Sequence, residues 1–570
     1  MQRQVRTPAW TAHHLGAESR HLSGEDVAFV ALALLLCGTL LLCRLDDIYL
    51  WQDEAETALV SRHWLAYGLP LSTDGTDWVQ QAGESLVEFT PDYVWIYHSW
   101  LQYAVTAASF AVLGPTTFAA RLPFVVVGLA TVAFFYRFVL RWLEDRRVAR
   151  VAIVLLLCCV PFLLLMRQCR YYALAAFFTL VTLDAYLQLR AARPWALPYF
   201  VVSSTLLYQS HYGAFFPTMA ALGIHWLFSQ KAKGLTRHFL IAATLTAAFV
   251  LPWAVYMRVW GRGDPFRLDR FLAHLGQHSV YITAWIFPLA LMAALAIAWL
   301  RQCPYWARQG LAIGWARNRG GRFALNTAQA RFCELAAWVI VANVVTLSAS
   351  AAFDWVFFRY VVHLIPLLIA LVSITLILIW DRWPLVACAL MVALLSSNAL
   401  GLLPYGLPGF RALKVDRLWP SSAAFRSLQE VWIKAGHFRS DPLMYFQELT
   451  HPYVGPNEGL VAFITTNAQP GQTVAVNYED LPLMFYTPQR VLGGMGLHDL
   501  GRDSQPDWVI DRQYGPYRDL LAAIVSGGMY ERIEIPYPDI RWENRPEPGE
   551  HHYLTVQDED PVVLYKRLGG

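Results

Sequence analysis

Two adjacent carboxylates, Asp53 and Glu54, follow directly after the first long apolar segment of the chain. A carboxylate at the end of a membrane span can act as a general base that takes a proton from a hydroxyl nucleophile. Acidic residues also simply mark the ends of spans, so the residues gathered around the pair decide its meaning. We take Asp53 as the first candidate for the base. Glu54 is the second candidate, or else positions Asp53 or a metal ion.

The composition is that of a membrane protein. Of the 570 residues, 56% are hydrophobic and 15% are charged, and the mean hydropathy is +0.35. Soluble domains carry about a quarter charged residues. Apolar runs recur from Val27 to Leu403, and runs of about 18 residues or more are long enough to cross roughly 30 Å of hydrocarbon. The sequence therefore predicts a polytopic α-helical membrane protein.

About eleven spans are expected. They are residues 27–45, 122–140, 148–166, 171–189, 195–208, 212–228, 239–257, 280–300, 332–353, 356–380 and 385–403. Short cytoplasmic loops carry an excess of Lys and Arg, which places the N-terminus and the basic loops around 141–147, 231–237 and 301–331 inside. Residues 98–114 are apolar, but counting them as a span would reverse every later loop, so we interpret them as an interfacial helix.

This topology divides the chain into three parts. Residues 1–26 form a cytoplasmic segment, and residues 27–403 form the transmembrane module with a long outer loop at 46–121. Residues 404–570 form a soluble domain outside the membrane. In that domain, strand-like runs at 473–476, 490–492, 508–510 and 532–535 accompany helical runs at 456–468 and 517–525, so a small α/β sheet is expected.

Charge and cysteine content argue against a nucleic-acid partner and against a zinc site. Residues 404–570 carry 15 Lys or Arg against 21 Asp or Glu, and the remainder carries 30 against 21. A basic membrane part with an acidic tail lacks the basic soluble face that a nucleic-acid partner requires. None of the eight cysteines lies beyond Cys388, and none shows zinc-site spacing.

Polar residues gather at the outer ends of the predicted spans. With the acidic pair, the candidate site residues that bind a lipid phosphate and a sugar are His98, Arg167, Arg170, Tyr171, His211, Tyr212, Arg359 and Tyr360. An ionised residue at membrane depth costs about 2.5–3.5 kcal/mol or more, so such residues face a polar cavity and one another. Planar guanidinium groups match the oxygens of a phosphate. The layer suits an anionic amphiphile that reacts with a hydroxyl.

Four further arginines, at 258, 262, 267 and 270, lie outside against the charge rule. They form either a salt-bridged, solvated loop or a basic surface that faces a lipid phosphate. Asp184 and Asn343, inside spans, are expected to join hydrogen bonds between helices.

These residues resemble the C superfamily of membrane glycosyltransferases (GT-C), in the protein O-mannosyltransferase-like branch that includes bacterial aminoarabinose transferases. Trp51-Gln52-Asp53-Glu54 is similar to the family's first outer loop, and Arg121-Leu122-Pro123 is similar to its Arg-Leu-Pro span. Residues 167–174 are similar to its Ser-Gln-Glu-Ala-Arg-Met-Tyr-Ala-Leu segment. His211-Tyr212 and Arg359-Tyr360 resemble positions that face the lipid phosphate. Two departures are Gln168, where the family has Glu, and Phe89-Thr90-Pro91-Asp92, where aminoarabinose transferases have Lys-Pro-Pro.

The resemblance implies an inverting transfer of a hexosyl or pentosyl group from a polyprenyl-phosphate donor to a hydroxyl of a protein, lipid or glycan, with Asp53 as the base. Family members differ in metal dependence, so a divalent metal, held by Asp53 and Glu54 if present, stays open. A transporter or flippase for a lipid-linked glycan is one alternative, and a scaffold whose soluble domain binds a partner is another. The absence of a sequon in the tail favours a bacterial inner membrane, with residues 404–570 in the periplasm.

Overall fold

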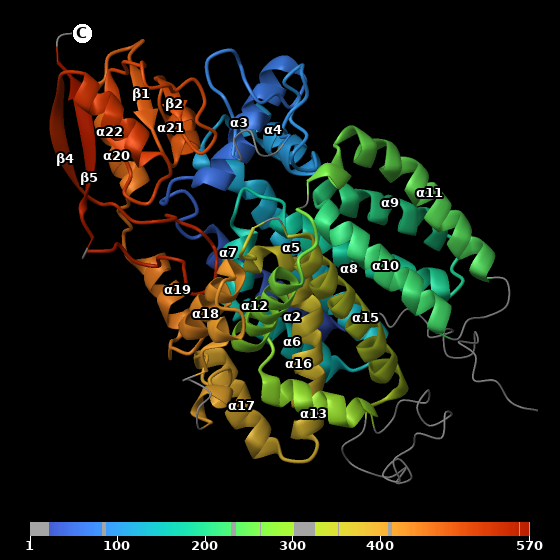
Figure 1. Ribbon diagram of the computed structural model, residues 1–570. Helices are drawn as coiled ribbons and strands as arrows, with labels where there is room; N and C mark the ends of the chain where they lie inside the picture. Colours follow the sequence, from blue (N-terminus) through green and yellow to red (C-terminus); the bar gives the residue numbers. More distant parts are fainter. Residues whose placement is uncertain are drawn as a thin grey trace, which may run out of the picture.

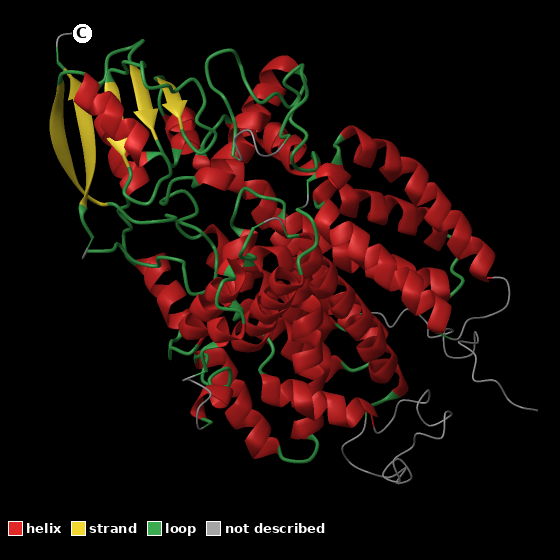
Figure 2. Cartoon of the chain, in the orientation of Figure 1, coloured by secondary structure: helices red, strands yellow, loops and turns green. Residues whose placement is uncertain are grey.

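The computed structural model describes residues 22–81, 87–229, 235–262, 264–300, 325–351, 353–407, 413–557 and 559–568. Most of the segment 1–26, Lys231 and Lys233, and residues 301–324 of the basic loop lie outside these ranges. Helices form the bulk of the molecule, and one sheet lies at its edge next to the end of the chain (Figures 1 and 2).

The membrane module is built from long apolar helices. Six are long and apolar enough to span a membrane: α2 (Gly24–Leu42), α5 (Thr117–Leu143), α8 (Tyr172–Arg190), α11 (Leu235–Tyr256), α15 (Thr327–Ser350), and η3 with α16 (Phe358–Leu364 and Ile365–Trp380). Shorter helices are α9 (Ala196–Ser210), α10 (Tyr212–Phe228) and α17 (Pro384–Ser396). The chain is therefore a multi-pass helical membrane protein, as predicted.

Two further spans are broken. The pair α6 (Arg146–Leu157) and α7 (Val160–Met166) is bent by 67°, and the pair α12 (Leu268–Trp285) and α13 (Leu289–Leu300) by 95°. The predicted spans at 148–166 and 280–300 are therefore interrupted, and neither is one straight helix. Pro288 lacks the N–H that a continuing helix needs, and it lies at the second break. With each broken pair counted as one span, the described residues hold up to eight by length and composition.

The outer loop contains two helices, α3 (Gln52–Tyr67) and α4 (Leu101–Leu113). Gly68 ends α3 in the left-handed conformation, with φ +77°, which glycine adopts without strain. The predicted helix at 98–114 is confirmed as α4. Its 13 residues are too few to cross the hydrocarbon.

The C-terminal part contains a five-stranded sheet. The strands of this sheet are β1 (Thr473–Val476), β2 (Arg490–Gly493), β3 (Trp508–Asp511), β4 (Tyr530–Pro538) and β5 (Pro561–Arg567). The helices of the C-terminal part are α18 (Ala423–Ala435), α19 (Asp441–Thr450), α20 (Pro456–Asn467), α21 (Asp480–Tyr486) and α22 (Arg518–Gly527). Short 3₁₀ turns are η2 (Val259–Gly261), η4 (Leu403–Gly406) and η5 (Val415–Leu418).

The strand order is β2-β1-β3-β5-β4. The three strands β2, β1 and β3 run parallel, while β5 pairs antiparallel with both β3 and β4. The four predicted strands and two predicted helices are confirmed. Strand β5 was not predicted, although it joins the parallel half of the sheet to its antiparallel edge.

This sheet unit docks on the outer loop rather than standing apart. Helix α21 packs against α3, and the two lie side by side in Figure 1. Tyr486 of α21 accepts a hydrogen bond from the Leu50 amide at 2.9 Å, and its hydroxyl lies 2.7 Å from the Thr117 hydroxyl. The start of α3 is thereby fixed between the membrane helices and the C-terminal sheet.

Polar side chains inside the spans pair with one another, as expected. The Trp142 indole donates to Asp184 at 2.7 Å. Asn343 donates to the Thr218 hydroxyl at 3.2 Å, and its side-chain oxygen lies 2.8 Å from His363 Nε2.

Candidate functional site

The first turn of α3 carries both members of the acidic pair. The helix begins at Gln52, so Asp53 and Glu54 lie at its positive end, where carboxylates are stabilised. Successive residues of an α-helix point about 100° apart, since 3.6 residues make a turn. The two carboxylates therefore point to different partners. Asp53 contacts Arg359, and Glu54 contacts Arg121.

Glu54 is completely buried, and its acceptor positions are filled. Oε1 accepts from Arg121 Nε at 2.8 Å and from the Cys169 amide at 2.7 Å. Oε2 accepts from Arg121 Nη2 at 2.6 Å and lies 3.5 Å from Asn544 Nδ2. A carboxylate offers about four lone-pair positions, so Glu54 has none left for a proton or a metal. The geometry gives Glu54 a structural role and does not fit its alternative roles as base or metal ligand.

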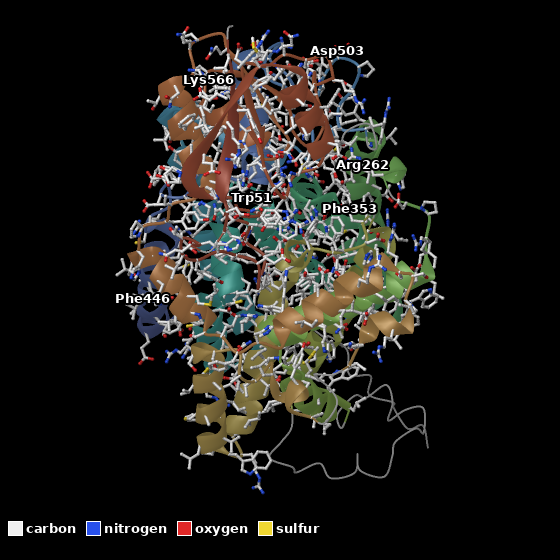
Figure 3. The ribbon with its side chains drawn as sticks, turned by 60° about the vertical axis from the view of Figure 1, so that its left-hand side comes forward. Trp51, Arg262, Phe353, Phe446, Asp503 and Lys566 are labelled. Atoms are coloured by element: carbon white, nitrogen blue, oxygen red, sulfur yellow. The ribbon has the colours of Figure 1, made fainter. Side chains whose placement is uncertain are left out.

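Asp53 is different, because its side chain keeps 15% of its surface exposed. Its Oδ2 lies 3.2 Å from Arg359 Nη2. Arg359 also lies over the rings of Phe357 and Trp51, with its guanidinium carbon 4.1 and 5.3 Å from the ring centroids. Figure 3 shows Trp51 where the helical body meets the part of the chain that carries the sheet. The structure therefore brings the candidate base into contact with Arg359, which the sequence placed in the same layer.

A third carboxylate, Glu56, lies one turn further along α3 and was not predicted. Arg170 binds it with both terminal nitrogens, at 2.6 and 3.0 Å. Tyr103 donates to the same carboxylate at 2.8 Å, and Gln81 donates to it at 3.0 Å. Because Glu56 occupies the fork of Arg170, this arginine acts on the site through Glu56 and through His98.

His98 joins this group through its Nε2 atom, which lies 2.9 Å from Arg170 Nη2. Burial lowers the pKa of His98 well below its usual value, and the charge of Arg170 lowers it further. The imidazole is therefore neutral. Since a guanidinium only donates, Nε2 accepts and the ring proton is on Nδ1. His98 can thus present a neutral N–H donor beside the acidic helix.

Tyr171 and His211 form a stacked pair, with ring centroids 4.2 Å apart and an interplanar angle of 4°. Gly213 allows this placement, because a Cβ there would lie 2.9 Å from the His211 ring. The Tyr212 ring lies 6.0 Å from that of His211, between centroids. Its hydroxyl accepts from Arg262 at 3.1 Å.

Arg262 and two of its neighbours do not form a free basic surface. Arg262 donates to the backbone carbonyls of Ile96, Tyr97 and Met257. Arg267 pairs with Asp269, and Arg270 pairs with Asp264 and Asp354. The salt-bridged reading of this loop is therefore the one that the structure supports.

Arg167, another predicted position, serves packing. Arg167 donates to the carbonyls of Cys43 and Arg44 at 2.9 and 3.0 Å, and it also contacts Tyr445 and Glu448 of α19. These contacts tie the end of α2 to the C-terminal part, so the geometry lends no support to a phosphate-binding role for Arg167.

Gln168 accepts from the Trp51 indole at 2.6 Å. It orients the residue that precedes α3 without adding a charge. Tyr360 is half-buried, and its ring meets that of Phe357 edge-on at 5.3 Å.

Residues from the C-terminal part reach the same layer, which the sequence did not reveal. Glu547 lies 3.3 Å from Arg359 Nη1, and Arg545 Nε lies 2.9 Å from Glu547. Both residues are almost completely buried. The sequence carries one usable signal for them, the rigid run Arg545-Pro546-Glu547-Pro548, but nothing in it places this run beside α3.

No protein-family model and no curated protein matches the chain. Among solved structures, ArnT from Cupriavidus metallidurans bound to undecaprenyl phosphate matches with a TM-score of 0.52 and 15% identity, over 95% of this chain and 98% of that one. The apo form of the same protein matches with a TM-score of 0.52 and 16% identity over the same shares. The chain therefore shares the fold of these two ArnT structures.

A weaker likeness is to the archaeal oligosaccharyltransferase AglB from Archaeoglobus fulgidus. Its TM-score is 0.43 at 11% identity, over 88% of this chain and 71% of that one. The conclusion about the fold depends on the two ArnT structures alone. The polytopic helical fold with a C-terminal sheet, which the sequence predicted, is confirmed by this likeness.

Metal ligation by the acidic pair gains no geometric support. Within the described ranges, no group of three or more His, Cys, Asp or Glu residues is placed to hold a metal ion. Asp53 alone of the acidic pair retains free lone pairs, and its nearest charged partner is a cation.

Asp480 of α21 links the C-terminal part to the start of α3, and we expect this link to depend on pH. Gln52 donates to its Oδ1 at 2.9 Å, while burial raises the pKa of Asp480 to about 6. The folded state thus holds the proton more tightly than the unfolded state does. As pH falls from 7 towards 4, the wild type gains stability from this group, about 3 kcal/mol when complete.

Asp480→Asn removes the titration and keeps an oxygen for Gln52. Thermal unfolding between pH 5 and 7.5 should show Tm of the variant exceeding that of the wild type at pH 7.5, with a smaller gap at pH 5. Asp503→Asn, at an exposed acid in the same part of the chain, should leave the pH profile unchanged. A constant gap across the pH range would refute the assignment.

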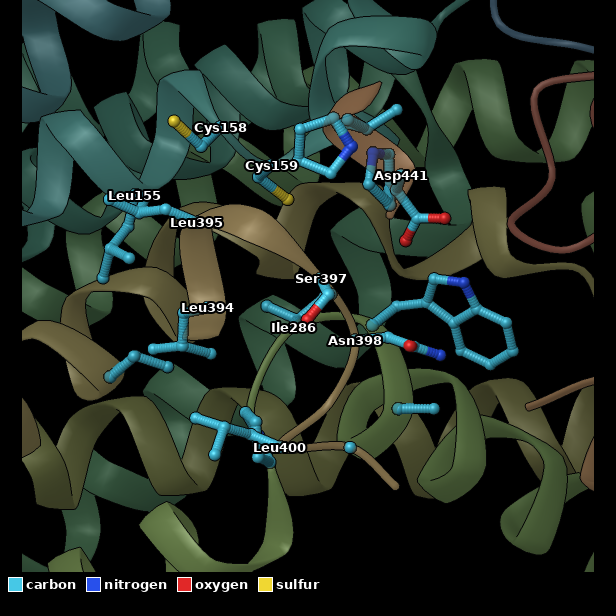
Figure 4. A pocket seen from close by; sticks show the side chains of 18 of the residues that line it. Leu155, Cys158, Cys159, Ile286, Leu394, Leu395, Ser397, Asn398, Leu400 and Asp441 are labelled. Atoms are coloured by element: carbon cyan, nitrogen blue, oxygen red, sulfur yellow. The ribbon is translucent and has the colours of Figure 1, made fainter. Parts of the chain in front are cut away.

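A separate cavity lies where the two broken spans meet α17 and α19 (Figure 4). It holds about 650 Å³ of empty space, part of it open at the surface. Leucines and isoleucines line it together with Cys158 and Cys159, and Ser397, Asn398 and Asp441 add polar groups. None of the predicted site residues lines this cavity.

Proposed function

We propose that the chain is an inverting glycosyltransferase that moves a sugar from a polyprenyl-phosphate donor to a hydroxyl acceptor. The observation that carries this proposal is the contrast between the carboxylates of α3. Glu54 and Glu56 are fully buried and held by Arg121 and Arg170, whereas Asp53 is partly exposed beside Arg359. One carboxylate free to accept a proton, next to a cation suited to a phosphate, is what a single inverting displacement needs.

In this reaction the acceptor oxygen attacks the anomeric carbon from the face opposite the phosphate. The new C–O bond forms as the bond from the sugar to the phosphate oxygen breaks, and its electron pair leaves with the polyprenyl phosphate. Asp53 takes the proton of the attacking hydroxyl. Arg359 stabilises the negative charge that grows on the leaving phosphate, an electrostatic contribution that a preorganised cation makes without rearrangement.

The donor class is supported by chemistry and by the fold. The acidic helix lies among buried arginines at the ends of apolar helices, where an amphiphile with an anionic head would be held. The ArnT structure with the same fold is bound to undecaprenyl phosphate. The loop charges support the orientation in the membrane, and the absence of a sequon in the tail supports a bacterial inner membrane. The site faces the outer side of a bacterial inner membrane, the N-terminus is cytoplasmic and residues 404–570 are periplasmic.

The proposal is tested by transfer of a radiolabelled sugar from a polyprenyl-phosphate donor in membranes that contain the purified chain. A transporter would move the lipid-linked sugar without consuming it, and a scaffold would do neither. Consumption of the donor with formation of a glycoside of inverted configuration supports the proposal. Movement of intact donor across the bilayer, without consumption, would replace it with the transporter reading.

Arg359→Ala should impair donor use more than acceptor use, because it removes the cation beside the leaving phosphate. We expect the donor KM to rise by about tenfold or more, the loss of a charge-assisted hydrogen bond. Arg170→Ala should act in the same direction by releasing Glu56 and His98. Initial rates measured at varied donor and fixed acceptor, and then the reverse, separate the two effects. A change confined to the acceptor KM would contradict the assigned role.

A further inference from the structure

Two arginines share one aromatic ring and one carboxylate at the edge of the site. The guanidinium carbons of Arg359 and Arg545 lie 4.1 and 4.5 Å from the centroid of the Phe357 ring. Glu547 Oε2 lies 3.3 Å from Arg359 Nη1 and 2.9 Å from Arg545 Nε. Two buried cations held this close repel each other unless an anion lies between them, and Glu547 supplies that anion.

Glu547 belongs to a strap, residues 542–551, that crosses from the C-terminal sheet unit to the membrane helices. Pro546 and Pro548 flank it and fix the backbone on both sides. Gly549 turns the chain with φ +80°. The carboxylate is thus presented on a stiff backbone, at little cost in conformational entropy.

Contacts on both sides of Glu547 hold the strap in place. Asn544 reaches Glu54 at 3.5 Å, on the side towards α3. Beyond Gly549, Glu550 accepts from Lys434 at 2.8 Å, and His551 Nε2 lies 2.7 Å from Glu448. With these contacts in place, the side chain of Glu547 can move without release of the strap.

Glu547 is incompletely satisfied where it lies. Its side chain is 2% exposed, and its Oε1 is buried without a hydrogen-bond partner. An oxygen shared by two guanidinium groups is also the arrangement in which arginines hold a phosphate. The carboxylate therefore occupies a position that an oxyanion with more acceptor oxygens would fill more completely.

We propose that Arg359 and Arg545 form a two-arginine clamp for the phosphate of a prenyl-type lipid phosphate, and that Glu547 occupies the clamp until the phosphate displaces it. The inference rests on the proposed function and extends it. It makes Arg545 a phosphate-binding residue, supplied by the C-terminal part of the chain. It also explains why the strap reaches the start of α3.

The test measures binding of farnesyl phosphate to the full chain in detergent micelles, by the ligand-induced rise in Tm. In Glu547→Gln, the competing charge is gone and the shape is kept, so half-maximal stabilisation should occur at a concentration at least about threefold lower than in the wild type. Misfolding cannot produce such a gain. Arg545→Gln should weaken the same response at least about tenfold.

Arg541→Gln is the matched control. Arg541 lies 3.8 Å from the centroid of the Trp542 ring, which Arg545 contacts at 3.7 Å, but it is exposed. Its response should equal that of the wild type. Unchanged or weakened binding in Glu547→Gln would overturn the clamp, as would wild-type binding in Arg545→Gln.

Inorganic phosphate provides the second arm of the test. It should stabilise the chain far less than farnesyl phosphate does at the same concentration, and an equal response would overturn the assignment to a lipid phosphate. If the wild type transfers sugar while Glu547→Gln and Arg545→Gln bind farnesyl phosphate as the wild type does, the clamp is refuted and the proposed function stands. If the wild type binds no prenyl phosphate, both fail.

Discussion

Asp53→Asn is expected to lower the rate of sugar transfer by about 10²–10⁴-fold, the contribution typical of a general base. The amide matches the carboxylate in size and can still contact Arg359, but it cannot accept the proton of the attacking hydroxyl. The donor KM should change little, because the phosphate-binding arginines are untouched. Single-turnover consumption of a polyprenyl-phosphate sugar, in membranes that supply the acceptor, measures this directly.

Asp47→Asn is the matched control for this substitution. Asp47 is an acid in the same outer segment, but its partner is Arg44 and both are partly exposed. It should transfer sugar at the wild-type rate. If Asp53→Asn retained more than about a tenth of the wild-type rate while Asp47→Asn was unchanged, the base would have to be another residue.

The second large effect concerns stability. Arg121→Met should destabilise the fold by about 3–5 kcal/mol, since it leaves the buried carboxylate of Glu54 without its cation. Arg121 also donates to the carbonyls of Leu45, Ile48 and Tyr49 at 2.7, 2.8 and 3.2 Å. Three of its five N–H groups thus hold the segment between α2 and α3 in place, and the other two bind Glu54. The expected result is a large fall in Tm in detergent, with loss of the monodisperse species.

The double variant Arg121→Met with Glu54→Gln should recover part of the lost stability, because no unpaired charge is then buried. Arg44→Met, which breaks the partly exposed pair with Asp47, should cost no more than about 1 kcal/mol. A fall in Tm for Arg121→Met no larger than that for Arg44→Met would show that the Glu54 pair is not a structural anchor.

Much of the membrane module was readable from the sequence because its signals are local. Long apolar runs predict spans, and the sidedness of Lys and Arg orders the polar residues into one layer. The same reasoning missed the 95° break between α12 and α13. The hydropathy of an apolar run is the same whether the helix continues or turns at a proline. The only local signal of the break is Pro288, which lacks the N–H that a continuing helix needs.

The site was predicted in part for a similar reason. Span order placed Asp53 and Arg359 in one layer at the outer ends, but their direct contact is seen only in the structure. The distinct roles of Asp53 and Glu54 depend on the direction in which each side chain leaves α3. That direction can be predicted only when the first residue of the helix is known. Glu547 is separated from Arg359 by 188 residues. No local pattern predicts that a loop of a separate sheet unit reaches into the membrane site.

Asp53 is, in our proposal, the general base for sugar transfer from a polyprenyl-phosphate donor. The most direct measurement is mass spectrometry of lipid-linked sugars in a strain that lacks this chain, complemented with either the wild type or Asp53→Asn. The account predicts that a polyprenyl-phosphate sugar accumulates in the deletion strain and in the strain with Asp53→Asn, and returns to its normal level with the wild type. Normal levels in the Asp53→Asn strain would contradict it.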